Sequence, residues 1–286
     1  MKISAIIPHY NDNERLKKCV SNILGSVDEI MIVDDNSSVK PVFNNKKIKI
    51  IYNEKNKGAA YSRNIGIKKC RFGHILCLDS DMYIDEKNLK KLINSFKDKD
   101  ILYPKQISYD SGSVMCPLFR KEEKYLQNSS IFFFNKNDLK ILDELFDENY
   151  QIYHEDADFF FRCYLFGLRT RYMPKVIAYH DAYKKIKNLK NREYLKLRNS
   201  IYSYLKFLGI SKKDKEEYAF PGYRCILGYL RNILKNKVDI DKKIYKLNKF
   251  YPMNFIIIFK AFFWNIRMLN QIIKKNKRLK CNIQKE

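Results

Sequence analysis

Short apolar runs and segments of helical spacing alternate along the first part of the chain. The runs predict buried strands at Ile3–Pro8, Glu29–Val33, Ile48–Tyr52 and Gly73–Leu78. Between them, one helix is predicted to begin at Asp12 and another to cover Gly58–Cys70. Strands that are apolar throughout and alternate with helices are typical of a parallel sheet covered on both faces. The pattern therefore predicts an α/β fold.

Beyond Asp81 the pattern becomes mixed. It predicts helices over Asp85–Phe96, Lys136–Leu142 and Glu155–Phe166, and strands over Ile101–Pro104, Ser130–Phe134, Arg169–Tyr172 and Val176–Tyr179. Tyr109–Lys124 carries no regular pattern. From Lys184 onward the spacing predicts helices only, at about 186–208, 214–236, 238–249 and 254–275.

The last of these helices is amphipathic. Its apolar face carries Phe255, Ile258, Phe259, Phe262, Phe263, Ile266, Leu269 and Ile273, and Lys260, Arg267, Gln271 and Lys274 lie on the other side. The longest apolar stretch, Phe250–Ile266, is interrupted by Lys260 and is shorter than the roughly 20 residues of a membrane span. Such a helix either lies in an anionic membrane surface or packs against the rest of the protein. We favour the membrane.

Charge divides the chain unevenly. The net charge is +24, and residues 184–286 hold 27 Lys or Arg against 7 Asp or Glu, so this last third carries +20. We therefore expect a catalytic domain over 1–183 and a basic helical region over 184–286. A basic module attracts polyanions such as anionic lipids, nucleic acid or phosphorylated substrates. A hydrophobic content of 45% excludes a mainly disordered protein.

The cysteines and the N-terminus point to a reducing compartment. Seven scattered cysteines form no C-x-x-C pair, and with four histidines they give little support to a zinc site. The apolar run after Lys2 is short and is broken by Pro8, so it does not resemble a secretory leader. We expect a cytoplasmic protein that is peripheral on the inner face of the cell membrane.

Asp79-Ser80-Asp81 follows the predicted strand Gly73–Leu78 directly. Two carboxylates at the tip of a buried strand repel each other and lose hydration, so a cation normally offsets them. Oxygen ligands of this kind suit Mg²⁺ or Mn²⁺ together with substrate phosphates. The alternative is a solvated turn. We predict a divalent-cation site at Asp79 and Asp81.

Three other strand ends or helix starts offer polar groups. Tyr10, in Pro8-His9-Tyr10-Asn11, presents a ring either to a nucleobase or to the edge of the core. Asp34-Asp35 either reads a base or ribose or ends its strand in an Asx turn. Gly58 opens a helix that contains Arg63, an arrangement that suits a diphosphate but also an ordinary capped helix.

The order and spacing of these motifs resemble the family 2 glycosyltransferases of the GT-A fold. The resemblance covers roughly residues 3–182 and rests on four segments: Ser4–Asn11, Val33–Ser37, Asn56–Asn64 and Leu78–Asp81. It implies a nucleotide-diphospho-sugar donor, a divalent cation and inversion at the anomeric carbon. It also implies that Pro8, Tyr10 and Asp35 surround the base, that Asp34 and Asp79 lie near base and ribose, and that Asp81 holds the metal. Asn11, Gly58, Arg63 and Ser80 complete the expected donor site.

A second constellation, His154-Glu155-Asp156, opens the predicted helix Glu155–Phe166. It resembles the Glu-Asp motif of the family, which implies that Asp156, or else Glu155, deprotonates the acceptor hydroxyl. The alternative is the ordinary enrichment of acids at a helix N-terminus. His180, at the end of the last predicted strand, is either a further metal ligand or a partly buried strand-end histidine.

The resemblance favours a single-sugar transferase. It implies a donor half over about 1–104 and an acceptor half over about 105–183, with a UDP-sugar favoured and a lipid-linked or cell-surface glycan as acceptor. A Gln-x-x-Arg-Trp motif is not evident, which argues against a processive synthase. The rival hypotheses are a catalytically silent nucleotide-sugar-binding scaffold and a nucleic-acid-binding protein. We expect no nucleic-acid partner, because the excess charge lies outside the motif region and no nucleic-acid motif is recognisable.

Overall fold

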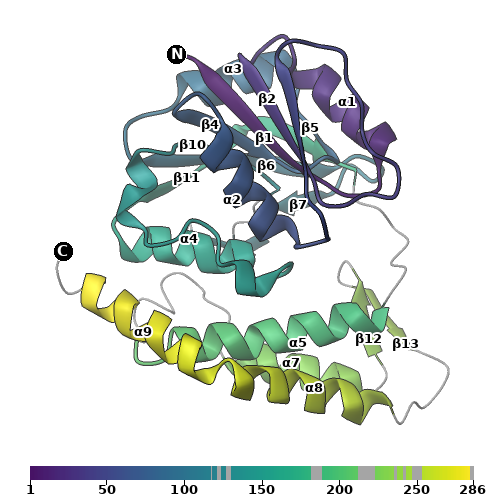
Figure 1. The fold of residues 1–286 in the computed structure, drawn as a ribbon, viewed down its shortest axis with the longest axis vertical. Helices are drawn as coiled ribbons and strands as arrows, with labels where there is room; N and C mark the ends of the chain where they lie inside the picture. The colour runs from purple at the N-terminus through teal and green to yellow at the C-terminus, as the bar shows by residue number, and fades with distance from the viewer. Residues whose placement is uncertain are drawn as a thin grey trace. The chain divides into compact units, whose positions relative to one another are not determined.

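The computed structural model describes residues 1–116, 118–120, 124–126, 130–181, 189–211, 223–234, 237–240, 243–246 and 253–283. The chain divides into two compact units, Met1–Ala182 and Tyr183–Glu286 (Figure 1). Each unit is described by itself below.

The first unit is built on one mixed sheet. Its strand order is β3-β2-β1-β4-β10-β6-β11-β5, with β7 paired to β6. The strands are β1 (Ile3–His9), β2 (Glu29–Asp34), β3 (Ile48–Tyr52), β4 (His74–Leu78), β5 (Met82–Tyr83), β6 (Asp100–Ser108), β7 (Val114–Cys116), β10 (Ile131–Asn135) and β11 (Arg169–His180). Strands β1 to β4 run parallel, whereas β10 is antiparallel to both β4 and β6. A separate hairpin joins β8 (Leu118–Arg120) to β9 (Lys124–Leu126).

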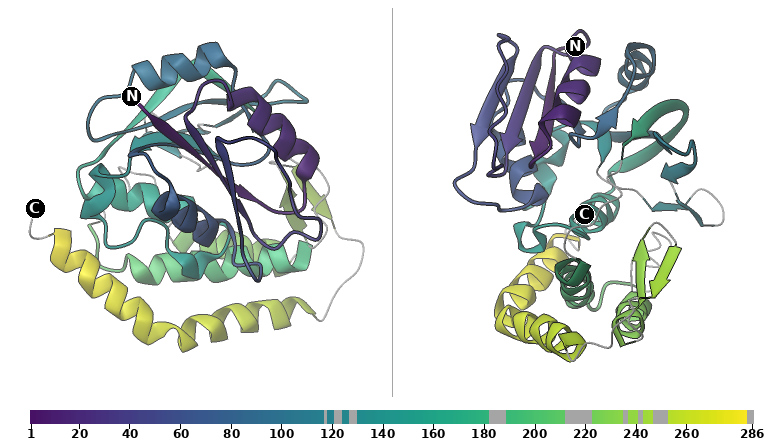
Figure 2. Two further views of the ribbon diagram at one scale, coloured as in Figure 1. Left: turned by 45° about the horizontal axis from the view of Figure 1, so that its top comes forward. Right: turned by 90° about the vertical axis from the view of Figure 1, so that its right-hand side faces the viewer.

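Helices cover both faces of this sheet, as the continuous apolar strands require (Figure 2). On one face, α1 (Asn13–Ile23) and α3 (Glu86–Asn94) join alternate strand residues in the main apolar core. On the other, α2 (Ala59–Lys69) comes so close that a Cβ on Gly66 would lie 2.4 Å from Cγ2 of Ile6. On the β10 strand, Phe132 contacts Phe159 of α4 (Glu155–Leu165). The predicted α/β fold is confirmed.

Two predicted elements of the first unit are wrong in detail. The helix expected over Lys136–Leu142 is a short 3₁₀ turn, η1 (Asp138–Ile141), and a second such turn is η2 (Glu148–Tyr150). The two strands expected near residues 169–179 form the single strand β11, whose register against β6 shifts between Met173 and Ile177. Pro174 lies in this irregular stretch and lacks the N–H that a regular ladder needs.

The second unit is not entirely helical. Its described helices are α5 (Leu189–Lys206), α7 (Tyr223–Leu234), α8 (Met253–Arg267) and α9 (Leu269–Ile283). Where the helix 238–249 was expected, β12 (Lys237–Ile240) pairs antiparallel with β13 (Lys243–Lys246), which corrects the all-helical prediction. β12 alternates polar with β-branched side chains, and β13 places Ile244 and Tyr245 between two lysines, a composition that suits strands.

The helix expected over 254–275 is broken. α8 and α9 meet at Met268 with a bend of 60°. After the bend, Asn276 donates hydrogen bonds to the backbone oxygens of Lys206 and Leu208, so α9 satisfies carbonyl groups at the end of α5. Within the described ranges, no single helix is long and apolar enough to cross a membrane, and this bent pair meets the criterion by length and composition alone.

Candidate active site

The carboxyl ends of the first strands meet at one edge of the sheet. His9 lies opposite Asp34 in the β1–β2 register, and Asp34 lies opposite Tyr52 in the β2–β3 register. β4 runs parallel to β1, and Asp79 follows it immediately. Ligands of open α/β sheets bind beyond such strand ends. The parallel topology therefore brings together motifs that are far apart in the sequence.

Asp81 and His180 form the first cluster at this edge. Nε2 of His180 lies 3.4 Å from a carboxylate oxygen of Asp81, because β11 pairs with β5 just beyond the Asp79–Asp81 turn. Burial alone would lower the pKa of His180, but the hydrogen bond to Asp81 and the charges of Asp81 and Asp79 outweigh it and raise this pKa. Within the motif, Ser80 is partly exposed.

The side chains of this cluster fit a divalent cation in part. Burial raises the pKa of Asp79, the charge of Arg63 opposes the shift, and the charge of Asp81 adds to it. Such mutual repulsion between carboxylates is relieved by a cation. Carboxylate and imidazole ligands suit Mn²⁺. Among the residues that the structure describes, no group of three or more His, Cys, Asp or Glu is arranged to hold a metal ion, so a cation at Asp81 would need further ligands from substrate or water.

Arg63 connects this cluster to the start of α4. Its guanidinium donates from NH2 to Oδ1 of Asp79 at 2.7 Å and from NH1 to Oε1 of Glu155 at 3.1 Å. The side chain is 3% exposed. Burial alone would lower the pKa of Arg63, but the charges of Asp79 and Glu155 outweigh this and raise it above its ordinary value. Arg63 was expected to face a diphosphate, whereas the structure buries it between two carboxylates.

The two acids that open α4 differ in environment. Glu155 is buried, its Oε1 accepts the Arg63 hydrogen bond, and its Oε2 has no hydrogen-bond partner among the described residues. Burial, with the charge of Asp156, raises the pKa of Glu155 to about 7 against the opposing charge of Arg63. Asp156 is partly exposed, and its Oδ1 accepts from the backbone N–H of Ala157. Of the pair, Asp156 is better placed to meet a substrate.

Asp35 holds the loop that precedes α2. Its Oδ1 accepts hydrogen bonds from Nδ2 of Asn53 and the backbone N–H of Lys57, and its Oδ2 accepts from the N–H of Gly58 at 2.7 Å. The carboxylate is thus occupied by its own chain. Its predicted contact with a nucleobase stays a prediction.

Gly58 makes a close approach that other residues do not permit. Its φ is +90°, and a Cβ built on it would lie 2.1 Å from the backbone oxygen of Gln151. Gln151, Tyr153 and His154 themselves have positive φ values of 65°, 68° and 68°. Non-glycine residues in this region carry strain, which clusters at functional sites. The start of α2 is therefore fitted against the loop that leads into α4.

The residues after β1 and β2 form the other side of the expected donor site. The Tyr10 ring is 53% exposed, which suits stacking on a base, and Pro8 is partly buried. Asn11 has a φ of 61°, and its Oδ1 accepts from the N–H and the hydroxyl of Ser38. Asp34 is fully buried, and its Oδ2 accepts from Lys40 Nζ and the N–H of Ser37.

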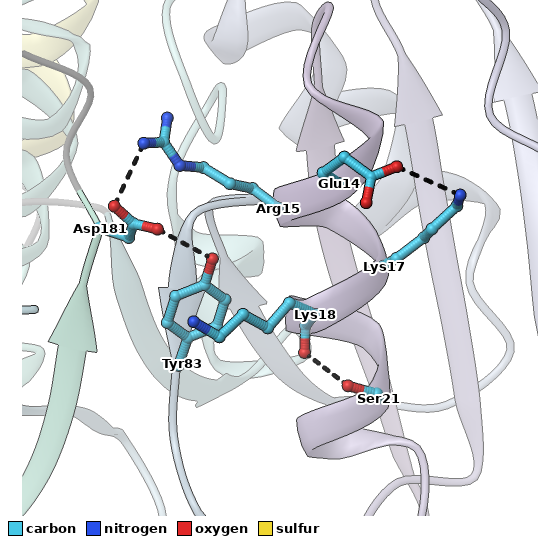
Figure 3. A pocket seen from close by; sticks show the side chains of 7 residues that line it. All are labelled: Glu14, Arg15, Lys17, Lys18, Ser21, Tyr83 and Asp181. Atoms are coloured by element: carbon cyan, nitrogen blue, oxygen red, sulfur yellow. Dashed lines mark hydrogen bonds and ion pairs between the residues drawn. The ribbon is translucent and has the colours of Figure 1, made fainter.

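An open hollow of about 580 Å³ lies between α1 and the ends of β5 and β11 (Figure 3). It is lined by Glu14, Arg15, Lys17, Lys18, Ser21, Tyr83 and Asp181. Arg15 pairs with Asp181 at 3.1 Å, and Lys17 pairs with Glu14 at 3.4 Å. The Lys18 ammonium lies 4.4 Å from the Tyr83 ring centroid. Arg15 and Lys17 are therefore paired with carboxylates, and Lys18 lies over an aromatic ring. Asp79, Asp81, Glu155 and Asp156 do not line this hollow.

The sequence did not single out Gln151 or Arg15. Gln151 lies in a loop without a motif, and its contact with Gly58 joins residues far apart in the chain. Arg15 reaches Asp181 across 166 positions. The burial of Arg63 had a local signal, because Ala60, Arg63 and Ile67 share one face of α2 at helical spacing.

The chain is similar to known proteins in both sequence and fold. Residues 4–157 match the family model described as Glycosyl transferase family 2. An uncharacterized glycosyltransferase of Haemophilus influenzae is 27% identical over 56% of this chain and 71% of its own length. Poly(ribitol-phosphate) beta-N-acetylglucosaminyltransferase TarP of Staphylococcus aureus is 25% identical over 87% of each chain. The crystal structure of GalNAc-T7 with UDP, GalNAc and Mn²⁺ is 15% identical with a TM-score of 0.55, over 81% of this chain and 57% of that one, a likeness of fold.

Proposed function

The chain belongs to glycosyl transferase family 2, and from that premise we propose that its first unit transfers one sugar from a nucleotide-diphospho-sugar to a hydroxyl acceptor, with inversion at the anomeric carbon. A UDP-sugar is the favoured donor, supported by the exposed Tyr10 ring and by the presence of UDP in the GalNAc-T7 crystal structure. A lipid-linked or cell-surface glycan is the proposed acceptor. TarP, named for poly(ribitol-phosphate), makes a polymeric hydroxyl acceptor the class to test first.

In the proposed reaction, the Asp156 carboxylate takes the proton of the acceptor hydroxyl. The acceptor oxygen forms its bond to the anomeric carbon as the bond from that carbon to the diphosphate oxygen breaks, and the nucleoside diphosphate leaves with the electron pair. General-base catalysis of this kind contributes roughly 10²- to 10⁴-fold. Glu155 does not serve as the first candidate for the base, because its carboxylate already accepts the Arg63 hydrogen bond.

Asp79, Asp81 and His180 would hold the divalent cation, whose chemistry is to neutralise charge on the leaving diphosphate. Arg63 keeps Asp79 in place and ties it to the helix that carries Asp156. This pair of hydrogen bonds from Arg63 is the main observation that supports the proposal. One buried guanidinium joins the acidic strand end and the Glu-Asp helix start, although 92 positions separate Arg63 from Glu155.

The test is a panel of nucleotide sugars offered with Mn²⁺ to polymeric and small hydroxyl acceptors, in which donor binding and transfer are measured separately. Asp156→Asn should keep donor affinity but lower transfer roughly 10²- to 10⁴-fold. Asp98→Asn, which changes an exposed acid away from the site, should leave both unchanged. Transfer by Asp156→Asn at the wild-type rate would remove Asp156 as the base. Donor binding without any transfer across acceptors would favour a silent scaffold.

A further inference from the structure

The outward face of α8 carries six exposed apolar side chains. They are Phe255, Ile256, Phe259, Phe262, Phe263 and Ile266. Phe259 is 73% exposed, and Phe255 and Ile266 are each 65% exposed. They recur at the spacing of neighbouring helix turns, so they form one continuous stripe along the helix. Contiguous apolar surface of this kind on a folded chain marks an interaction site.

The inward face of α8 already completes the core of the second unit. Ile257 and Ala261 pack with Leu197 and Ile201 of α5 in the apolar cluster of that unit. Asn265, also buried, donates hydrogen bonds to the backbone oxygens of Arg198 and Ala261. Trp264 also contacts α5, with its ring 5.8 Å from that of Tyr202. The helix is therefore held by its inward side chains, and the exposed phenylalanines take no part in these contacts.

Positive charge accompanies the apolar stripe. Residues 253–283 contain seven Lys or Arg and no Asp or Glu. Exposed Lys260 and Arg267 lie on α8 itself. α9 adds Lys274, Lys277 and Arg278, all of which are exposed. The occupant of this surface must therefore be apolar where it meets the phenylalanines and anionic beside them.

We propose that α8 lies in the surface of an anionic membrane, with its six exposed apolar side chains in the acyl boundary and the cations of α8 and α9 among the lipid head groups. Interfacial helices combine such a face with flanking Lys and Arg, and each cation near an anionic leaflet adds about fivefold in affinity. A second copy would bring like charge to the same surface. Nucleic acid would satisfy the cations but would leave the phenylalanines in water.

The test uses the full chain and two kinds of vesicle, phosphatidylcholine alone and phosphatidylcholine mixed with phosphatidylglycerol. Co-sedimentation should show binding to the mixed vesicles that weakens with added salt. Phe259→Ser with Phe263→Ser should lower this affinity about 10-fold or more. The matched pair Val42→Ser with Ile141→Ser, which changes exposed apolar residues of the first unit, should have no effect.

A second pair of variants tests the same proposal through charge, in case the serine variants unfold. Lys274→Glu with Lys277→Glu changes exposed charges and should lower affinity about 10-fold or more, whereas Lys46→Glu with Lys87→Glu, the same charge change on the first unit, should not. Equal binding to both vesicles, or an equal loss in the control pairs, would overturn the proposal. An oligomer in solution that dissociates in the serine pair, without a change in vesicle binding, would assign the face to a second copy instead. None of these readouts depends on glycosyl transfer.

Discussion

The strand-end site and the outward face of α8 and α9 differ in how their cations are placed: the first buries and pairs its cation, and the second exposes its cations. At the site, Arg63 is 3% exposed and is fixed between Asp79 and Glu155 by hydrogen bonds of 2.7 and 3.1 Å. On the other surface, Lys274, Lys277 and Arg278 of α9 are exposed, and so are the phenylalanines of α8. Groups that are to act on a reacting bond must be held in one geometry. Groups that attract a surface act through summed charge and need no fixed partner.

The largest loss of stability should come from removing the buried guanidinium of Arg63. Arg63→Ala leaves two carboxylates without their cation in a buried setting, and breaking such a pair costs about 3–5 kcal/mol. Lys274→Ala removes an exposed cation of the second unit and should change stability by no more than about 0.5 kcal/mol. Chemical denaturation of both variants checks the contrast. Equal stabilities would mean that the Arg63 network does not hold the site together.

Two glycines, one beside the site and one in α7, should respond to substitution in opposite ways. Gly58→Ala must place a Cβ at a φ of +90° and 2.1 Å from the Gln151 oxygen, so it should cost about 2–3 kcal/mol. Gly228→Ala lies in α7 with no atom within 4 Å of its Cβ, and it should stabilise the helix by about 0.5–1 kcal/mol. Thermal melting distinguishes the two signs. A neutral Gly58→Ala would show that the start of α2 does not depend on its fit against Gln151.

The burial of Glu155 should also make stability depend on pH. Because burial raises the pKa of Glu155 from 4.5 to about 7, the folded state holds this proton more tightly than the unfolded state does. The stabilisation from this proton is fully present below pH 4.5 and is lost as the pH rises through about 7. Glu155→Gln should flatten the stability profile across this window, and Glu86→Gln, at an exposed acid, should not. A profile that Glu155→Gln leaves unchanged would contradict the assignment.

Local pattern was enough for the strands and helices that carry the motifs. The apolar runs predicted β1 to β4 nearly to the residue, because each is a short apolar run bounded by polar turns. The same reasoning mistook the β12–β13 hairpin for a helix, since short segments with apolar residues suit either period. It also extended one helix through Met268, where the structure has a bend of 60°. The contact of α9 with the end of α5 joins residues that are remote in sequence.

For the site, the sequence indicated which residue types mattered but not how they are joined. Asp79 and Asp81 were recognised from their position after a strand, and Asp156 and Glu155 from their resemblance to the Glu-Asp motif of the family. That Arg63 lies between Asp79 and Glu155 follows from a sheet topology that places β10 beside β4 and β11 beside β5. Pairing across 92 positions leaves no local signal in a single sequence.

The proposed function requires that the first unit bind a nucleoside diphosphate through a cation held at Asp79, Asp81 and His180. The most direct test is calorimetric titration of the full chain with UDP, with and without Mn²⁺, for the wild type, Asp81→Asn and the exposed-acid control Asp98→Asn. We expect wild type and Asp98→Asn to bind UDP only with Mn²⁺, and Asp81→Asn, still folded, to bind it about 10-fold or more weakly. Equal affinity of Asp81→Asn and wild type, or UDP binding that does not respond to Mn²⁺, would contradict it.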